Sequence, residues 1–597
     1  MKIKLSDYVF RFLADHGVKH VFMLPGGGAM HLNNALGANN QIDYTCMLHE
    51  QGAAVAAEGW ARVTNDLGVA LVTTGPGGTN AVTGVLAAWQ DSTPCLFLSG
   101  QVKRPDIAGN SGMRQLGVQE VDIVSIVKSI TKYAVTVMEP DQIRYHLEQA
   151  LHLARSGRPG PVWLDIPLDV QAAMVDTETM SGFTATDRFA VVSQQDVETT
   201  LAWLCQAERP VILAGNGIRV AGATTEFLSL VDILGIPVLT TRLGVDLIPA
   251  AHPHCFGMPG GIASRSANFI LQNSDCLLIL GARLDLALIG YAPDRLARGA
   301  RKIMVNIDPL EIKKLGGAIN LPIAADARSF IQKMQATAGQ CGQRDISAWR
   351  QRCRQWRERY PFVTPEHFKL DGLSLYAFSQ LLSDALRGGE VVLPGSAGVC
   401  AEIFLTAFQA KPGQRIFHNK GTGAMGLCQP SAIGACLASG GATTVCVDGD
   451  GGFQMNIQEL EVVRRRQLPI KFFVINNGGY ASIRASQSAF FGRLTGADAT
   501  SGLTLPDVKK LAVAYGIAVE QISNVEEARQ KLPQLLVAAG PVVCEVMTLP
   551  DEVRAPRVAA AQRKDGSMFS KPLEDMWPFL DREEFLANMI VPPLPEE

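Results

Sequence analysis

The chain has 597 residues and a formal net charge of −3, with 54 basic residues facing 57 acidic ones. Neither sign forms long runs, so no extended surface for nucleic acid or a membrane is indicated, while small anionic ligands stay compatible. Apolar residues make up 47% of the chain. A chain of this length exceeds what one hydrophobic core normally holds, so we expect roughly three domains.

The cysteines and the first residues of the chain indicate in which cellular compartment the protein is expected. Twelve cysteines are scattered without a C-x-x-C pair, which favours reduced thiols packed as small apolar groups over metal ligation by sulfur. The opening M-K-I-K-L-S-D-Y starts directly on an amphipathic helix pattern, and no run of about 18 apolar residues occurs. We therefore expect a soluble, cytoplasmic protein.

Strand and helix patterns alternate through most of the chain, which predicts an α/β protein with a doubly wound parallel sheet in each of three domains. The first domain is expected at residues 1–175. A polar stretch, Asp176 to Gln195, separates it from a second domain at 196–340. Within the second domain we predict strands at Pro210–Ala214, Cys276–Leu280 and Lys302–Ile307.

A charged connection, Gln343 to Leu370, predicts a surface helix followed by a loop. The third domain is expected at 371–547. The tail, 548–597, has little periodicity and forms a C-terminal arm. An arm that folds over an active-site mouth and a plain surface extension fit this sequence equally well.

The stretch from Val447 to Tyr480 carries the most specific chemistry. V-D-G-D-G-G-F closes one predicted strand and F-F-V-I-N-N-G-G closes the next. The interval between Asp450 and Asn477 holds a turn, a predicted helix of about three turns (Asn456 to Arg466) and a strand (Ile470 to Ile475). That is one crossover of a parallel sheet, so both side chains should emerge at the same edge.

These residues suit a divalent cation that carries a diphosphate. Asp450, Asn477 and the carbonyl of Gly479 supply the oxygen ligands that Mg²⁺ prefers. Glycines let the backbone approach phosphate closely, and the following helix start offers free N–H groups; they are Gly449, Gly451 and Gly452. A glycine-rich turn with no ligand is the alternative.

G-D-G followed by N-N at this spacing is similar to the signature of thiamine-diphosphate (ThDP) enzymes. Such enzymes need a carboxylate that activates the cofactor's aminopyrimidine, and Glu50 in M-L-H-E-Q-G-A-A matches it. A favourable first-turn helix charge is the alternative for Glu50. The flanking motifs V-F-M-L-P-G-G-G and L-V-T-T-G-P-G-G-T-N resemble the acetohydroxyacid synthase-like group, and they place Gly27, Gly28 and Pro76 against the cofactor.

The third domain extends the resemblance. G-T-G-A-M-G matches the segment under the cofactor, with Gly423 beside it and Met425 forcing its bent conformation, although a Met there also suits core filling. P-G-S-A-G matches the diphosphate segment Gly395, Ser396 and Ala397, where acetohydroxyacid synthases usually have Gln-His. Because that family binds the cofactor between two subunits, the resemblance implies a homo-oligomer, at least a dimer.

The second domain resembles the flavin-binding domain of the same enzymes, which implies FAD in a structural rather than a redox role. A degenerate domain without a nucleotide is the alternative. Glycine-rich strand ends suit a dinucleotide pyrophosphate. The residues that match the family's flavin contacts are Arg158, Gly215, Gly217, Gly257, Arg283, Asp308 and Asp326.

The expected substrates follow from the positions at which this sequence matches the acetohydroxyacid synthase pattern and from those at which it departs from it. Gln119 resembles the substrate-facing Gln of acetohydroxyacid synthases, and the region Gln101 to Asp122 lacks the His pair of pyruvate decarboxylases. However, the Arg that binds the second keto acid is Ala287 here, and the Trp of the acceptor pocket is Ser486. These departures resemble the yersiniose-pathway type of ThDP flavoenzyme.

We therefore expect a Mg²⁺- and ThDP-dependent carboligase that decarboxylates pyruvate and transfers the two-carbon unit to a ketone, such as a nucleotide-linked keto-sugar. Two alternatives stay open. One is an acetolactate synthase that joins two pyruvates, and the other is a non-catalytic protein of the same fold used for assembly or regulation.

Overall fold

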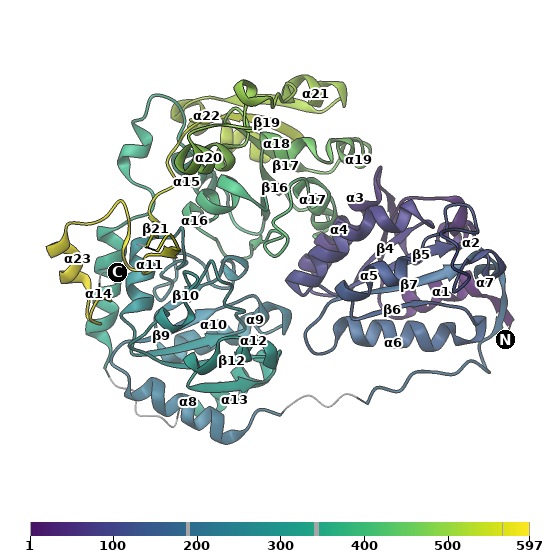
Figure 1. Ribbon diagram of the computed structural model, residues 1–597, viewed down its shortest axis with the longest axis horizontal. Coiled ribbons are helices and arrows are strands. Elements are labelled where there is room, and N and C mark those ends of the chain that lie inside the picture. Colours follow the sequence, from purple (N-terminus) through teal and green to yellow (C-terminus); the bar gives the residue numbers. More distant parts are fainter. Residues whose placement is uncertain (1, 187–190, 340–344, 564, 596–597) are drawn as a thin grey trace.

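The computed structural model describes residues 2–186, 191–339, 345–563 and 565–595. Three parallel sheets form three α/β domains, with the first at the right of Figure 1, the second at the lower left and the third at the top. The expected fold is confirmed. The boundary expected at 340, the start of the connection at 343 and the last two residues of the arm lie outside the described residues.

The first sheet has the strand order β3-β2-β4-β5-β7-β6, and every neighbouring pair is parallel. Its strands are β2 (His20–Met23), β3 (Asp43–Cys46), β4 (Gly68–Val72), β5 (Cys95–Gln101), β6 (Tyr133–Thr136) and β7 (Pro161–Pro167). Its helices are α1 (Leu5–Asp15), α2 (Met30–Ala38), α3 (Glu50–Thr64), α4 (Pro76–Asp91), α5 (Ile123–Val127), α6 (Ile143–Arg155) and α7 (Leu168–Ala172). The short strands β1 (Lys2–Lys4) and β8 (Met174–Asp176) pair antiparallel at its ends.

Successive residues of β4 pack into different clusters, because side chains alternate between the two faces of a sheet. Val69 and Leu71 join the core under α1, α2 and α6, whereas Ala70 and Val72 join the core under α3 and α4. Burial on both faces explains why these strands are continuous apolar runs.

The second sheet has the order β10-β9-β11-β12-β13 and is also parallel. Its strands are β9 (Pro210–Ala214), β10 (Val238–Thr240), β11 (Cys276–Leu280), β12 (Arg301–Asn306) and β13 (Leu321–Ala324). Its helices are α8 (Gln194–Gln206), α9 (Gly217–Val220), α10 (Thr224–Leu234), α11 (Arg265–Gln272), α12 (Pro309–Lys313) and α13 (Ala327–Ala338). The three strands predicted here are confirmed, the third with a shift of one residue.

The third sheet has the order β15-β14-β16-β17-β19-β18, again parallel. Its strands are β14 (Val391–Pro394), β15 (Arg415–Ile416), β16 (Thr444–Gly449), β17 (Ile470–Asn476), β18 (Ala518–Ile522) and β19 (Val542–Met547). Its helices are α15 (Leu375–Ala385), a π-helical turn η9 (Cys400–Phe404), α16 (Leu405–Ala407), α17 (Cys428–Ala438), α18 (Asp450–Gln454), α19 (Leu460–Arg466), α20 (Ala481–Phe491), α21 (Val508–Ala514) and α22 (Val525–Val537).

The first and third domains meet where α3 crosses α17. A Cβ on Gly59 would collide with the backbone of Ser431, and one on Gly434 would collide with the backbone of Ala56. Small residues at the crossing therefore let the two backbones approach closely. One hydrophobic cluster runs through both domains, so the two sheets are fixed relative to each other.

The charged connection differs from the expected surface helix. Its helix, α14 (Ser347–Arg359), buries Trp349, Cys353 and Trp356 in the core of the second domain. Because charged residues stand between these positions, the apolar stripe with helical spacing was not recognised in the sequence.

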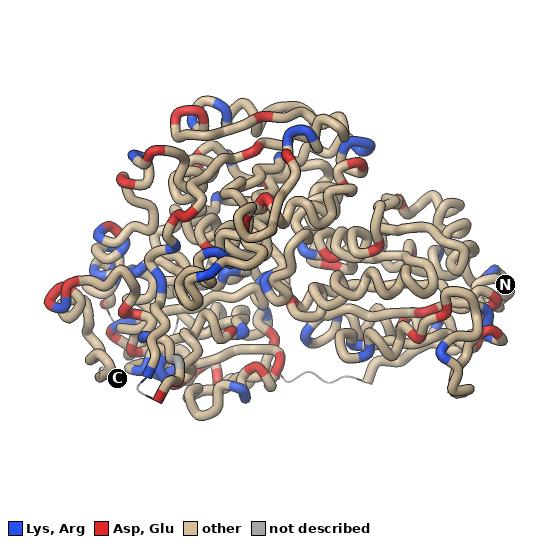
Figure 2. The backbone as a smooth tube through the Cα atoms, turned by 45° about the horizontal axis from the view of Figure 1, so that its top comes forward, with Lys and Arg blue, Asp and Glu red and all other residues tan. Residues whose placement is uncertain are grey.

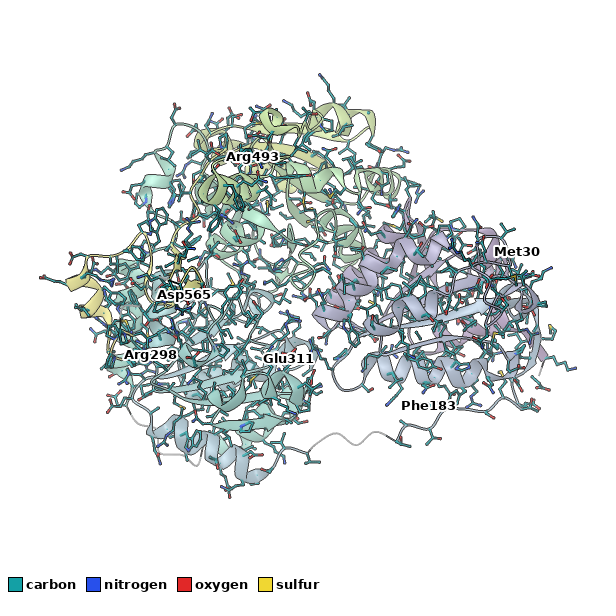
Figure 3. All side chains as sticks on the ribbon, viewed as in Figure 1. Met30, Phe183, Arg298, Glu311, Arg493 and Asp565 are labelled. Atoms are coloured by element: carbon teal, nitrogen blue, oxygen red, sulfur yellow. The ribbon has the colours of Figure 1, made fainter. Side chains whose placement is uncertain are left out.

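The C-terminal arm also packs against the second domain. Its elements are β20 (Arg557–Val558), β21 (Ala560–Gln562), β22 (Met568–Ser570), β23 (Met576–Trp577) and α23 (Arg582–Asn588). Leu573 and Phe585 enter the same core cluster, and Arg298, labelled in Figure 3, pairs with Glu574 at 2.6 Å. The arm therefore contributes to the second domain's core, which neither expected alternative described.

Charges are dispersed over the fold. In the view of Figure 2, Lys and Arg alternate with Asp and Glu along the backbone, without a continuous face of one sign. None of the helices in the described part of the chain combines the length and the apolar character needed to cross a bilayer.

Candidate functional site

The two strand ends predicted to carry the metal residues are brought together. β16 and β17 are parallel neighbours, with Asp450 directly after the first and Asn477 directly after the second. The backbone N–H of Gly479 donates to Oδ2 of Asp450 at 2.9 Å. The predicted turn after β16 is instead the first turn of α18, so Asp450 starts a short helix.

Two buried oxygens at this edge favour a cation. Oδ1 of Asn477 has no hydrogen-bond partner among the described residues. Burial raises the pKa of Asp450, although the N–H groups of Gly479 and Gly451 donate to it. An unpaired buried oxygen beside a desolvated carboxylate is costly, and a divalent cation satisfies both. The described residues contain no group of three His, Cys, Asp or Glu side chains suited to a metal, consistent with a site built from one carboxylate, one amide and one carbonyl.

The glycines at this edge differ in what they pack against, and the sequence alone did not show the difference. A Cβ on Gly395 would stand 2.5 Å from Oδ1 of Asp448, and one on Gly452 would stand 2.7 Å from the same atom. Burial raises the pKa of Asp448 to about 7. Gly451 faces the ring of Tyr480, whereas a Cβ on Gly449 would meet no described atom within 4 Å.

Three segments converge beside this edge. The carbonyl of Ser396 lies 3.9 Å from the Cβ position of Gly423, which has a φ of +58°. Cε of Met425 lies 3.3 Å from the Cβ position of Gly451. Three segments are thus neighbours: the expected diphosphate segment, the segment that carries Met425 and the glycine-rich start of α18. Ala397, in the first of these segments, is exposed.

Glu50 is the first residue of α3 and is 8% exposed. Its Oε2 accepts a hydrogen bond from Nδ2 of Asn80 at 3.0 Å. The next residue, Gln51, accepts from Nδ2 of Asn456 at 2.8 Å, and the same nitrogen donates to the carbonyl of Gly426 at 2.8 Å. The start of α3 is therefore hydrogen-bonded, within one chain, to the segment that carries Met425.

The glycine motifs around Glu50 shape the first domain's strand ends. Gly28 packs on Thr74, with 2.8 Å from its Cβ position to Cγ2, whereas Gly27 has open space. Pro76 is the first residue of α4, the helix that carries Asn80.

Gln119 lies in an irregular segment and has a φ of +65°. Its side chain is exposed, while its carbonyl oxygen packs onto Gly75, where a Cβ would collide with it. The carboxylate of Glu120 accepts from the N–H groups of Ala108, Leu116 and Gly117. Backbone contacts therefore fix the position of Gln119, although its side chain is free to reach a ligand.

A separate cavity of about 670 Å³ lies between the first and second domains. Four predicted flavin residues line it: Arg158, Gly217, Arg283 and Asp326. Figure 3 shows Glu311 at this junction, and its Oε1 accepts from Nη1 of Arg158 at 2.8 Å.

Three other predicted flavin residues do not line the cavity. Gly215 packs against the backbone of Gly281, and Gly257 has a φ of +84°. Asp308 caps α12 and pairs with Arg158 at 3.0 Å. Close backbone packing explains Gly215, the positive φ explains Gly257, and the ion pair between domains explains Asp308.

Comparison with known proteins places these features in one family. Three family models match in order: the thiamine pyrophosphate enzyme N-terminal TPP binding domain at residues 3–126, the central domain at 197–334 and the C-terminal TPP binding domain at 396–546. The large subunit of acetolactate synthase isozyme 2 from Escherichia coli (strain K12) is 32% identical over 554 residues, which cover 91% of this chain and 95% of that protein. The chain belongs to the thiamine pyrophosphate enzyme family. Thiamine pyrophosphate is another name for ThDP.

Other relatives of this thiamine pyrophosphate enzyme carry the same description. The large subunit of acetolactate synthase isozyme 3 from the same strain is 32% identical over 550 residues, covering 89% of this chain and 92% of that protein. A probable acetolactate synthase large subunit from Methanocaldococcus jannaschii is 30% identical over 570 residues, covering 92% and 93%. The chain is thus a ThDP-dependent enzyme of the acetolactate synthase-like group.

The two departures from the synthase pattern lie at the surface of this enzyme. Ala287 is exposed, between exposed Leu286 and buried Leu288. Ser486 lies on α20 and its hydroxyl donates to the carbonyl of Ile483 at 3.0 Å. Within the described residues, the hydroxyl of Ser486 makes no hydrogen bond to Asp450, Asn477 or Gly479.

The sequence pattern alone did not identify several residues around the site. Asn80 and Asn456 are ordinary helix and loop residues in the pattern, and only the fold pairs them with Glu50 and Gln51. Asp448 was visible in D-G-D-G-G, where its place one residue inside the strand end indicated a buried carboxylate.

Proposed function

We propose that this enzyme binds ThDP with Mg²⁺, decarboxylates a 2-keto acid such as pyruvate and joins the two-carbon unit to a second carbonyl compound. The observation that carries the proposal is the meeting of Asp450, Asn477 and Gly479 at one sheet edge, with Oδ1 of Asn477 left without a partner in the described residues. Of the possible reactions, acetolactate formation from two pyruvates is the best supported, because the relatives are described as acetolactate synthases.

The residues present fit the cofactor and its cation. Asp450, Asn477 and the carbonyl of Gly479 would hold Mg²⁺, and Gly449 leaves open space for phosphate oxygens. When bound, ThDP supplies a nucleophilic carbon and an electron sink for the pair that remains after loss of carbon dioxide.

The protein's own side chains would exchange the proton, support the cofactor and contact the substrate. Glu50, buried at a helix start and held by Asn80, would exchange a proton with the aminopyrimidine nitrogen. Met425, beside Gly451, would support the bent cofactor. Gln119 would contact the substrate, with its backbone fixed against Gly75.

We also propose that FAD occupies the cavity between the first two domains. Its volume of about 670 Å³ and its lining by Arg158, Gly217 and Arg283 suit a dinucleotide whose phosphates lie at glycine-rich strand ends. The role is structural, because non-oxidative ligation moves no net electrons. FAD released by denaturation, at one per chain, would support this assignment.

We further propose a homodimer, since the family resemblance places the cofactor between subunits and the Gln119 side chain is exposed in the single chain. Mass photometry with and without ThDP checks this. A monomer that is fully active at nanomolar concentration would contradict it.

A second candidate is ligation to a ketone, including a nucleotide-linked keto-sugar. The specific observation in its favour is the exposed methyl group of Ala287, where a synthase would present a guanidinium. The relatives favour acetolactate over this acceptor, which reverses the order that the sequence led us to expect.

One experiment separates the candidates. The enzyme is incubated with pyruvate alone, and with pyruvate plus a panel of neutral and sugar ketones, and the products are identified by mass spectrometry. Rapid acetolactate formation from pyruvate alone supports the synthase. Acetolactate formed only in traces, beside an efficient ketone adduct, would establish the second candidate.

A further inference from the structure

Arg484 holds the loop that carries two of the expected cation ligands. It is the fourth residue of α20 and is 6% exposed, whereas the rest of that helix is partly or fully exposed. Its Nη2 donates to the carbonyl of Asn477 at 2.8 Å, and its Nη1 donates to the carbonyl of Gly478 at 3.1 Å. A guanidinium presents its donors in a rigid planar fork, so bonds to two successive carbonyls fix the orientation of the loop.

This loop depends on contacts from outside for its shape. Gly478 and Gly479 have φ values of +77° and +124°, and two successive glycines leave the backbone flexible. The carbonyl of Asn476 accepts from the N–H of Thr548 at 3.0 Å, and Arg484 occupies the next two carbonyls. The buried Oδ1 of Asn477 stays without a partner among the described residues. The held backbone therefore presents this amide oxygen to a ligand.

The same guanidinium reaches the start of the C-terminal arm. Its Nη2 also donates to the carbonyl of Pro550 at 2.7 Å, and its Nε lies 3.4 Å from Oδ1 of Asp551. The Asp551 side chain is 86% exposed, so this ion pair adds little. On another side of the loop, a Cβ on Gly479 would stand 2.5 Å from the carbonyl oxygen of Ala497. Carbonyl bonds and close packing, rather than the ion pair, hold the loop.

The rigidity of such a loop affects which cation it binds. Mg²⁺ requires nearly ideal octahedral geometry at about 2.0–2.1 Å, whereas Ca²⁺ accepts irregular sites at about 2.3–2.6 Å. Asp450, on the other strand end, is fixed by the N–H groups of Gly451 and Gly479. A loop that is equally fixed favours the smaller ion, and a loosened loop loses that preference.

We propose that Arg484 is a positioning residue that fixes the geometry of the cation site and thereby its preference for Mg²⁺ over Ca²⁺. This inference rests on the proposed Mg²⁺–ThDP site and names the residue that determines its cation. A guanidinium has no lone pair to give a cation. Arg484 therefore acts only through the backbone of Asn477 and Gly478.

Attachment of the arm is the competing role for Arg484, because it also bonds to Pro550. Arg554 separates the two roles. Its Nη1 pairs with Oε2 of Glu402 in η9 at 2.7 Å and lies 3.5 Å from the hydroxyl of Ser482. Arg554→Gln thus loosens the arm while the loop carbonyls keep their donors.

The test titrates ThDP into the full chain by calorimetry, at a series of MgCl₂ or CaCl₂ concentrations, for the wild type and Arg484→Gln. We expect the Mg²⁺ concentration for half-maximal ThDP binding to rise by about 10- to 150-fold, the range for losing one hydrogen bond to a charged group. The Ca²⁺ concentration should rise less, so the preference for Mg²⁺ falls. At saturating Mg²⁺, exchange of the cofactor's C2 proton should return to the wild-type rate, because the bond between Glu50 and Asn80 is unchanged.

Three further variants complete the test. Arg484→Lys keeps the charge but not the planar fork, so the preference for Mg²⁺ should fall by a smaller factor. Asp551→Asn removes only the exposed ion pair, and Arg554→Gln removes only the other attachment of the arm. Both should keep the wild-type preference.

The outcomes distinguish failure of the inference from failure of the proposed function. A wild type that binds ThDP equally well without a divalent cation removes the proposed site, and the inference with it. If the wild type requires a cation but does not prefer Mg²⁺, or if Arg484→Gln weakens binding equally with both ions, the inference alone is wrong. The same change in Arg554→Gln assigns the effect to the arm. If Arg484→Gln does not fold, a wild-type preference in the folded Arg484→Lys enzyme overturns the inference.

Discussion

Gln51 and Asn456 share a hydrogen bond of 2.8 Å that joins the first domain to the third, one residue from Glu50. Replacing Asn456 with Ala leaves two carbonyl oxygens, on Gln51 and Gly426, without their donor. We expect a loss of about 1–3 kcal/mol at this contact and a comparable loss of ThDP affinity, because the start of α3 and the segment that carries Met425 lose their fixed relative position. Thermal unfolding and ThDP titration by fluorescence measure both. Unchanged ThDP affinity would show that this contact does not position the two segments for the cofactor.

Asp450→Ala should abolish tight binding of Mg²⁺ and ThDP together. It removes the one anionic ligand from a site whose other ligands, Asn477 and Gly479, are neutral. Isothermal titration with ThDP at several Mg²⁺ concentrations measures the loss. Full activity of the variant without added Mg²⁺ would rule out the metal assignment.

Glu50→Gln should still bind ThDP but slow exchange of the cofactor's C2 proton by at least about 10²-fold, the usual cost of losing a positioned acid–base group. Gln keeps the size of the side chain and an oxygen for Asn80 to donate to. Deuterium exchange followed by NMR gives the rate. Exchange at the wild-type rate would mean that Glu50 is only a helix-start charge.

Gly75→Ala should displace Gln119, because the new Cβ would collide with the Gln119 carbonyl and because Gly75 has a φ of +61°. We expect kcat to fall at least about 10-fold, from a cost of roughly 1–3 kcal/mol. Gly109→Ala is the matched control. It has a φ of +52° in the same region but meets no described atom within 4 Å, so it tests backbone strain without the collision. Equal effects of the two variants would contradict the positioning role.

Glu459 should make stability depend on pH. It is fully buried, its carboxylate accepts from the N–H of Leu48, and burial raises its pKa to about 7. The folded chain therefore keeps a proton that the unfolded chain releases near pH 4.5. The free energy of unfolding should fall by on the order of 3 kcal/mol as the pH rises from about 4.5 to about 7, and should change no further above that through this group.

Thermal unfolding of Glu459→Gln checks this dependence, because the variant should lose much of the decline between pH 5 and 7. Glu461→Gln, at a partly exposed residue paired with Arg464, is the control and should follow the wild type. A decline that is identical in all three proteins would exclude Glu459 as its source.

Local patterns were sufficient for much of the fold. β9 and β11 are short apolar runs bounded by turns, and their predicted limits match the structure. Asp450 and Asn477 could be placed together because parallel strands joined by one crossover end at the same edge. α14 was misjudged because three apolar positions among many arginines give a weak pattern until the surface they cover is known.

Contacts between distant segments could not be read from the sequence. Gly395 and Gly452 need their small size because both face Asp448, a fact of packing rather than of motif. The hydrogen bonds that Asn80 and Asn456 donate to Glu50 and Gln51 also depend on which segments the fold brings together. Which acceptor the enzyme takes stays a prediction, because Ala287 and Ser486 are departures from the synthase pattern at single positions.

The stoichiometry of carbon dioxide release from pyruvate alone, with ThDP and Mg²⁺, tests the central claim most directly. A carboligase that joins two pyruvates releases one carbon dioxide for every two pyruvates consumed and accumulates acetolactate. We predict that ratio, and its loss in Asp450→Ala. One carbon dioxide per pyruvate with free acetaldehyde, or no consumption of pyruvate, would contradict the account.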